Sequence, residues 1–162
     1  MAINPEHYLN SPSPASVKRD IASHYSGKDV VLFTSLCQFV WVQGEPLPLI
    51  YETENEIYTK QGINLPALKQ LEAIGLISLE SAGYVKKRFG RHARLFYHGK
   101  PMKIRFPQEE NNQLDLGHVL LTDLGKSLAT VCGARRNQEF YEYIIKRWFQ
   151  QGMVVSSILA NH

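Results

Sequence analysis

The sequence has few of the features that mark disulfide scaffolds, metal sites or membrane proteins. Only 2 of its 162 residues are cysteines, and neither belongs to a CxxC pair. Cys37 and Cys132 each lie in an apolar segment, so we expect both to be core thiols rather than ligands or nucleophiles. No apolar run approaches the ~20 residues that a membrane-spanning helix needs, and the first residues lack the basic and apolar parts of a signal peptide. These absences predict a cytoplasmic protein that does not enter a membrane.

Motifs for catalysis and cofactor binding are missing as well. The 6 histidines show no metal-ligand spacing with one another, with cysteine or with aspartate. A glycine-rich phosphate loop, a nucleophile elbow and a paired-carboxylate motif are all absent. We therefore expect the protein not to be an enzyme and to hold no metal or other cofactor.

One segment is rich in basic residues and has no acidic residue, and this is the strongest charge pattern in the chain. Between Lys86 and Arg105 there are eight of the 18 basic residues and no Asp or Glu. The rest of the chain holds the other 10 basic residues and all 15 acidic ones, although the net charge is only +3. A basic segment on an acidic body is typical of a surface that binds a polyanion. The ordinary alternative is a solvated hairpin whose charges protect an edge strand from aggregation.

A helix, a glycine and a strand are predicted between residues 65 and 80. Apolar residues recur at three-residue spacing up to residue 74, which is typical of one helix face. Gly75 fits the left-handed position just past a helix end, and residues 77–80 predict a strand. The inward face of the helix is expected to hold Leu65, Leu68, Leu71 and Ile74.

A later segment runs from a strand into a helix. Residues 119–121 predict the strand, and Thr122 is the expected N-cap. The following helix is expected to place Leu124, Leu128 and Val131 on one face. A helix, a glycine and a strand, followed by a strand that returns into a helix, form the skeleton of a winged helix.

Two motifs carry a resemblance to known proteins. They are LE-x-x-GLI at residues 71–77 and LT-x-x-G-x-x-L at residues 121–128. The pair resembles the winged helix-turn-helix domains of bacterial transcription regulators, notably the multiple-antibiotic-resistance-regulator type. That resemblance implies an α+β winged-helix fold and DNA binding, although winged helices also serve as protein-docking modules.

A closer resemblance, covering roughly residues 15–132, is to a family of uncharacterised bacterial proteins. It rests on LC-x-FVW at residues 36–41, PLIY at residues 48–51 and LDLG at residues 114–117. This likeness implies no particular activity.

The remaining segments predict flanking elements. Proline and serine in residues 1–14 indicate a flexible lead-in. Helices are expected from Ser13 to about His24, from Lys28 to about Val42, from a capping box at Thr53 to Gln61, and from Asn137 to Gln151. A turn is expected at residues 44–48, a hairpin around residues 98–101, a polar loop at residues 107–117 and an apolar tail after Gly152.

The helices at residues 53–61 and 65–74 predict a helix-turn-helix pair. The second helix would present Lys69 and Gln70 to base edges. However, residues 51–77 hold four Glu and two Lys, and an acidic region is poorly suited to phosphate. The alternative is that this helix is structural or binds protein.

The basic segment, by contrast, favours binding to nucleic acid. Five of its residues are expected in or beside the wing, where they would follow phosphates or enter a minor groove: Lys86, Lys87, Arg88, Arg91 and Arg94. A further alternative uses Phe89 and Tyr97, with the neighbouring arginines, to stack the bases of a single strand.

The final helix predicts a second contact surface. Phe140, Ile144 and Trp148 recur at four-residue spacing and form one apolar row. We expect this row to form the interface of a two-fold homodimer. The alternative is that the helix packs on its own domain.

These observations predict three parts and one leading function. The parts are a lead-in at residues 1–14, a winged helix-turn-helix domain at residues 15–133, and a C-terminal helix and tail at residues 134–162. The predicted fold is α+β, with helices added at both ends of the winged helix. The predicted function is DNA binding, as in transcription regulation, and the alternative is a protein-interaction module that does not bind DNA.

Overall fold

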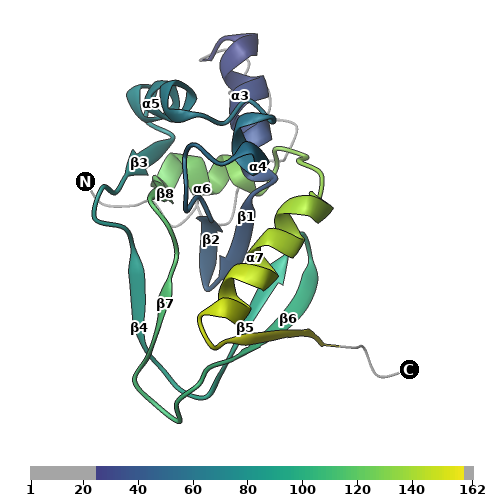
Figure 1. The fold of residues 1–162 in the computed structure, drawn as a ribbon. Coiled ribbons are helices and arrows are strands. Elements are labelled where there is room, and N and C mark those ends of the chain that lie inside the picture. The colour runs from purple at the N-terminus through teal and green to yellow at the C-terminus, as the bar shows by residue number, and fades with distance from the viewer. Residues whose placement is uncertain (1–24, 159–162) are drawn as a thin grey trace, which may run out of the picture.

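Five helices and nine strands follow one another through residues 25–158, the part of the chain that the computed structural model describes (Figure 1). The lead-in predicted for residues 1–14 and the helix predicted to end near His24 lie outside the described residues. The mixture of helices and antiparallel strands confirms the α+β class. The helices are α3 (Gly27–Cys37), α4 (Glu56–Thr59), α5 (Leu65–Ala73), α6 (Asp123–Ala129) and α7 (Gln138–Gln150).

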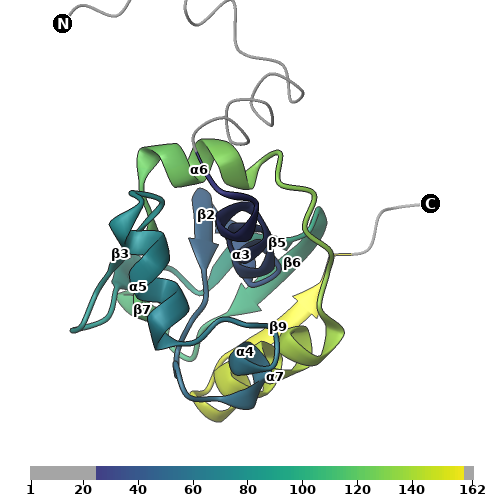
Figure 2. The same cartoon turned by 90° about the horizontal axis from the view of Figure 1, so that it is seen from above.

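The strands form three antiparallel sheets. The largest has the order β2-β1-β5-β6-β9, and two-stranded sheets pair β3 with β8 and β4 with β7. Figure 1 shows α7 lying along the large sheet, and Figure 2 shows α3, α5 and α6 gathered over the strands. The strands are β1 (Val40–Gln43), β2 (Glu45–Pro48), β3 (Ile77–Leu79), β4 (Val85–Phe89), β5 (His92–Tyr97), β6 (Lys100–Arg105), β7 (Asn112–Asp115), β8 (Val119–Leu121) and β9 (Val154–Ser157).

The first described helix is shorter than predicted, because its expected last turn is a strand. The helix predicted to end near Val42 ends at Cys37, and β1 follows it. β-Branched and aromatic residues favour a pleated, half-buried strand. Trp41 is buried and Val42 is exposed, which is the alternation of a strand. The next strand begins at Glu45, inside the turn predicted for residues 44–48.

The two short helices α4 and α5 form at the predicted place, with one change of cap. Asn55, and not Thr53, caps α4 by accepting a hydrogen bond from the backbone N of Ile57 at 2.9 Å. Asn64 caps α5 through its side-chain oxygen. Gly75 has a φ of +84°, which confirms the left-handed position that only glycine adopts without strain.

Two leucines that were predicted to face inward point outward. Leu65 in α5 and Leu124 in α6 are 43% and 47% exposed. Thr122 caps α6 and Leu128 is buried, both as predicted, but the helix also packs through Gly125. A Cβ on Gly125 would lie 2.1 Å from the backbone oxygen of Leu76. At Gly125 the helix therefore approaches the segment between α5 and β3 more closely than any side chain would allow.

The segment predicted as a polar loop, residues 107–117, contains strand β7. Asn112 is buried there, and its side-chain amide donates to the carbonyl oxygens of Gly90 and Gln108, at 2.9 Å each. β7 pairs with β4, so β4 does not pair back onto β3. Leu114 is also buried. The polar composition of residues 107–117 therefore did not indicate the strand, which forms by pairing with β4 from an earlier part of the chain.

Helix α7 belongs to the core of this chain and presents no apolar row to solvent. Phe140, Ile144 and Trp148 are at most 1% exposed. The Trp148 ring packs edge-on against Trp41, with ring centroids 5.3 Å apart. The prediction that these three residues form an exposed dimer row is wrong, because the large sheet supplies the apolar surface that the row covers. Homodimerisation itself stays a prediction.

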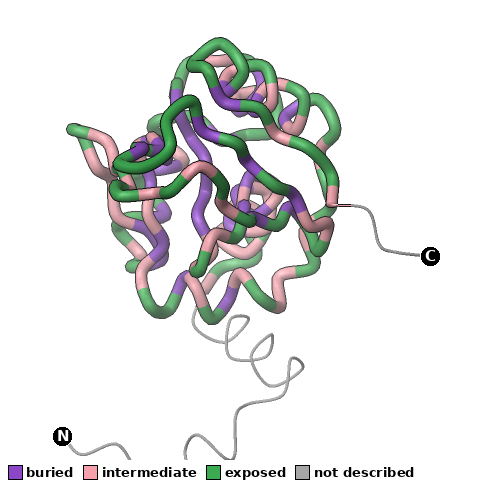
Figure 3. Tube along the Cα trace, turned by 90° about the horizontal axis from the view of Figure 1, so that it is seen from below, coloured by how far each residue is buried: buried purple, intermediate pink, exposed green. Residues whose placement is uncertain are grey.

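The predicted apolar tail after Gly152 begins with a strand. Residues 154–157 form β9, which pairs antiparallel with β6 at the edge of the large sheet. Met153, just before this strand, is buried in the same core as α7. Figure 3 shows that the buried stretches of the trace lie inside the molecule and that exposed stretches surround them.

Candidate nucleic-acid interface

Strand β5 has one buried face and one exposed face. Leu95 and Tyr97 are buried, whereas His92, Arg94 and Phe96 are exposed. Successive side chains of a strand point to opposite faces, so the three exposed residues share one side. This alternation places two basic or titratable residues and an aromatic residue together in solvent.

Strand β6 extends the same exposed face. Lys103 and Arg105 are exposed, and they alternate with the buried residues Met102 and Ile104. The face shared by β5 and β6, which we call the basic face, consists of His92, Arg94, Phe96, Lys103 and Arg105.

The cross-strand register places two like charges opposite one another on the basic face, because Arg94 pairs with Lys103. His92 pairs with Arg105. Like charges at directly opposite positions destabilise a sheet, by roughly the 0.2–1 kcal/mol that opposite charges contribute. Strands β5, β6 and β9 contain no acidic residue. None of the three cations forms an ion pair with an acidic residue in the described part of the chain.

A hollow of about 530 Å³ lies at one end of the basic face. Desolvation, and then the positive charges of Lys103, Arg105 and Arg91, lower the pKa of His92 from its usual 6.5. The imidazole is therefore neutral at pH 7 in the free protein. The hollow is lined by Arg91, His92, Lys103, Arg105, Val154 and Ser156.

The structure brings two of the predicted residues, Arg91 and Arg94, to this region, but not Lys86. The Lys86 ammonium donates to the backbone and side-chain oxygens of Gln43, at 2.7 and 2.8 Å, and lies 3.6 Å from a carboxylate oxygen of Glu45. Lys86 is therefore engaged with the turn between β1 and β2.

The other predicted basic residues lie elsewhere. Lys87 and Arg88 are exposed on β4, whose partner is β7 and not the large sheet. The register of that pair shifts between Lys86 and Phe89, and Arg88 adopts a φ of +67° there. This irregular backbone separates the start of the basic segment from the basic face.

The two aromatic residues proposed for base stacking are already occupied within the protein. Tyr97 is buried and stacks on Trp41, with ring centroids 5.0 Å apart. Phe89 is half-buried and stacks on Phe106 at 5.1 Å. Phe96, which lies between leucine and tyrosine on β5, is 41% exposed instead. The period-two alternation of the predicted hairpin was the signal that would have identified it.

Helix α5 places Lys69 and Gln70 in solvent, but away from the basic face. The side-chain amide of Gln70 donates to a carboxylate oxygen of Asp29 at 3.3 Å. The Glu72 carboxylate, on the same helix, accepts from the backbone N of Leu79 at 2.7 Å. Figures 1 and 2 show α5 beside β3, with β5 and β6 in another part of the molecule.

A groove of about 680 Å³ lies beside the start of α5, and it was not predicted. It is assembled from the loop before α4, the start of α5 and the ends of β3 and β8, so no local pattern indicates it. We call this groove the acidic groove. Its lining combines the acidic residues Glu52, Glu54 and Glu80 with the apolar residues Leu65, Leu79 and Val119, together with Tyr51, Thr53, Asn55, Ser81 and His118.

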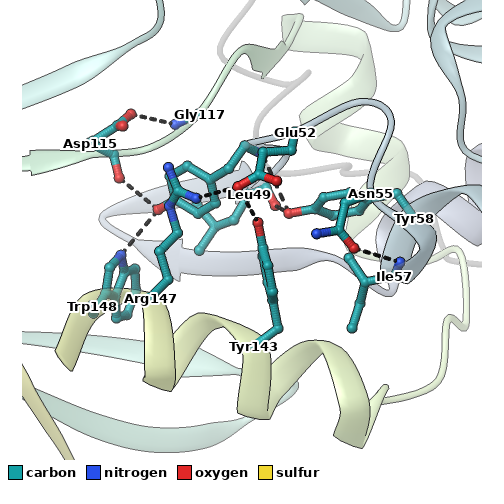
Figure 4. Close-up of polar contacts among 11 residues, drawn as sticks. Leu49, Glu52, Asn55, Ile57, Tyr58, Asp115, Gly117, Tyr143, Arg147 and Trp148 are labelled. Atoms are coloured by element: carbon teal, nitrogen blue, oxygen red, sulfur yellow. Dashed lines mark hydrogen bonds and ion pairs between the residues drawn. The ribbon is translucent and has the colours of Figure 1, made fainter. Parts of the chain in front are cut away.

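Helix α7 holds one acidic residue of this groove in place (Figure 4). The Arg147 guanidinium donates to a carboxylate oxygen of Glu52 at 2.9 Å. The Tyr143 hydroxyl donates to the same oxygen at 3.4 Å. Glu52 is thus a structural member of the groove lining, and its charge is compensated by Arg147.

Tyr51 connects the groove to the core. Its hydroxyl donates to the backbone oxygen of Asp115 at 2.6 Å and accepts from the Trp148 indole N at 3.1 Å. The Arg147 guanidinium lies 4.1 Å from its ring centroid. Burial raises the pKa of Tyr51 well above its usual value, so the hydroxyl stays protonated and serves this network as a donor.

Residues 25–158 contain neither a metal-binding cluster nor a membrane-spanning helix. No group of three or more His, Cys, Asp or Glu side chains is placed to hold a metal ion there. Over the same residues, no helix combines the length and the apolar character needed to cross a membrane.

The described part of the chain is thus an α+β unit with a basic sheet face and a separate acidic groove. Residues 26–145 match the family model described as "Protein of unknown function (DUF2806)". This match spans more than half of the chain, so the chain belongs to the DUF2806 family. No curated protein and no solved structure matches it.

Proposed function

We propose that this protein binds nucleic acid through the basic face of β5 and β6. The observation that carries the proposal is the opposition of Arg94 to Lys103 without an acidic partner. A like-charge pair costs folding free energy, and a polyanion recovers that energy when it binds. Phosphate groups are the polyanionic ligand that arginine and lysine recognise most strongly.

We further propose that the framework is a winged helix with an enlarged wing. The supporting features are the α4–α5 pair, the left-handed Gly75 after it and the return strand β8 beside β3. A backbone hydrogen bond of 2.9 Å from His118 to Ile50 adds the segment before α4 to this strand pair. In this interpretation β4, β5, β6 and β7 are the wing, and the wing rather than α5 carries the phosphate contacts.

The surroundings of α5 argue against a direct reading of base edges by this helix. Phosphate contacts supply much of the affinity for DNA, and Glu54, Glu72 and Glu80 lie on or around α5. Lys69 and Gln70 stay candidates for sequence preference, which a transcriptional role requires. The proposal includes no catalytic step, and it fits the cytoplasmic location that the sequence predicts.

Salt-dependent binding tests the proposal. The full chain and the triple variant R94A/R105A/K103A are titrated against dye-labelled random-sequence oligonucleotides, both duplex and single-stranded, at several salt concentrations. We expect the variant to bind at least tenfold more weakly at low salt. Its log–log salt slope should be shallower by roughly 0.7–0.9 for each phosphate that the variant no longer neutralises.

The matched control changes charge and polarity on α5 instead. K69A/Q70A should leave non-specific affinity within twofold and alter only sequence preference. An equal decrease in affinity for both variants, or no binding by the parent protein at low salt, would contradict the proposal.

A protein-docking role is the second candidate, and the acidic groove is the observation that favours it. Its apolar and carboxylate side chains are complementary to a peptide that carries an aliphatic residue between lysines or arginines. Titration with a labelled Lys-Leu-rich peptide tests this role. Binding that is abolished in L65E but retained in R94A/R105A/K103A would support it.

A further inference from the structure

Phe96 gives the basic face an aromatic surface beside its cations. It is 41% exposed, so part of its ring is open to a ligand. Across the ladder it pairs with Pro101 on β6 and with Val42 on β1, and Val42 is also exposed. The basic face therefore ends in a small apolar platform.

The platform and the cations lie on the same side of the sheet at successive positions. Phe96 and Arg94 are two residues apart on β5, so their side chains are neighbours on one face, roughly 7 Å apart along the strand. Lys103 lies directly across from Arg94. One nucleotide at this end could place its base on Phe96 and its phosphate between the two cations.

Only an unpaired nucleotide can use this arrangement. In a duplex the faces of the bases are stacked on one another, whereas in a single strand they are accessible to an aromatic ring. A sheet that presents an exposed aromatic residue next to a basic track is the combination used for single strands. In addition, no helix of the described chain projects from the basic face, so this face offers no helix to the major groove of a duplex.

We infer that the preferred ligand of the basic face is single-stranded nucleic acid, with a base stacked on Phe96 and the adjoining phosphate held by Arg94 and Lys103. This inference rests on the proposed function, since it names the ligand class of the same site. It differs from the sequence prediction in its aromatic residue, because Phe89 and Tyr97 are both stacked within the protein.

An oligonucleotide without bases separates stacking from phosphate binding. The full chain is titrated by fluorescence anisotropy with oligothymidylate, with an abasic oligonucleotide of equal length and with a duplex of equal length. We expect oligothymidylate to bind about tenfold more tightly than the abasic strand, within the range that one base–aromatic stack provides. The duplex is expected to bind more weakly than oligothymidylate at the same salt concentration.

Substitutions at Phe96 then assign the stack to this residue. F96L should weaken binding to oligothymidylate about tenfold and leave binding to the abasic strand unchanged, within the range of one base–aromatic stack, and F96Y should restore binding. The control F149L changes an aromatic residue that is 67% exposed on α7, and it should have no effect. Thermal melting checks that each variant is folded.

The results of these titrations distinguish the proposed nucleic-acid-binding function from the inference that the ligand is single-stranded. If the parent protein binds none of the three ligands, the proposed function fails and the inference fails with it. If it binds all three equally, or if F96L matches the parent on oligothymidylate, then the phosphate-binding function stands and the single-strand inference is overturned.

Discussion

The acidic groove and the basic face differ in how they are assembled as well as in charge. The groove takes its lining from four separate stretches of the chain, which meet only after α5, β3 and β8 have packed together. The basic face comes from two neighbouring strands joined by a tight turn at His98 and Gly99. A surface of the first kind depends on tertiary packing, whereas a surface of the second kind depends on the register of one hairpin.

This difference determines what each surface tolerates. Directly beside the groove, the backbone at Gly117 closely approaches that of Ile50, so a change of shape there disturbs the fold. The basic face consists of exposed side chains whose removal changes charge and leaves the core intact. We therefore expect variants at the groove to change stability and variants at the basic face to change binding.

The largest expected effect is at Gly117, beside the groove residue His118. A Cβ at this position would lie 2.5 Å from the backbone oxygen of Ile50, and its φ is +84°. We expect G117A to lower the free energy of unfolding by about 3 kcal/mol, since steric overlap and left-handed strain act together. For a chain of this size that corresponds to a Tm lower by roughly 6–12 °C in thermal melting.

Gly75 provides the control for this prediction. It has the same φ of +84°, but a Cβ there would meet no atom within 4 Å. G75A should therefore introduce only the left-handed strain, about 1–2 kcal/mol. Equal melting temperatures for the two variants would show that the approach to Ile50 is not a constraint.

The second prediction concerns Tyr51, which ties the groove to α7. Y51F removes the hydroxyl that accepts from the Trp148 indole N and donates to the Asp115 carbonyl, and both partners are left without it. We expect a decrease of about 1–3 kcal/mol in unfolding free energy. Y143F, which removes the longer 3.4 Å contact with Glu52 from a half-buried hydroxyl, should have a smaller effect, below about 1 kcal/mol. Neither variant should alter binding to oligothymidylate.

The third prediction concerns pH and is specific to the basic face. The lowered pKa of His92 means that the free protein holds this imidazole neutral at pH 7. A bound phosphate favours the charged imidazolium, so binding takes up a proton and strengthens as the pH falls. We expect the affinity for oligothymidylate to rise several-fold between about pH 7.5 and about pH 5.5. H92Q should lack this rise, while H98Q at the hairpin turn should keep it.

The same lowered pKa has a consequence for stability with the opposite sign. A histidine whose pKa is lower in the folded state than in the unfolded state disfavours folding once the unfolded form is protonated. The ligand-free protein should therefore become less stable as the pH falls through about 6.5, while its affinity increases. An affinity that falls together with stability would indicate that His92 is remote from the bound phosphate.

The smallest expected effect tests the energetic cost of the like-charge pair. K103Q removes one charge of the pair with Arg94 and should stabilise the protein by a few tenths of a kcal/mol at low salt. The gain should disappear at high salt, because screening removes the repulsion. Lys87 is exposed on β4 and has no cross-strand partner in the register. K87Q should therefore leave the melting temperature unchanged at both salt concentrations.

Local patterns predicted the elements whose ends carry specific capping residues. Gly75 stops α5, Thr122 starts α6 and Asn137 starts α7, as expected from the sequence. The hairpin at residues 98–101 also formed where it was predicted, because its strands pair locally. The basic segment was recognised as a candidate surface for the same reason, since its charges are contiguous along the chain.

The errors occurred where a distant segment decided the outcome. Residues 40–42 became a strand because β2 and β5 were available to pair with them, and residues 112–115 became a strand because β4 was available. Among the predicted binding residues, Arg94 reached the basic face, while Lys86 turned to Gln43 and Glu45. A contiguous run of charge does not reveal which of its members are engaged by other segments of the chain.

The sequence by itself determined the α+β class, the end of α5, the starts of α6 and α7 and the position of the basic hairpin, because each depends on residues close together in the chain. Only the tertiary structure decided that Phe140, Ile144 and Trp148 are core residues, since the large sheet covers them. It also decided that Phe96 rather than Phe89 is exposed. The physical reason is that burial depends on which apolar surfaces meet, and those surfaces come from segments far apart in the sequence.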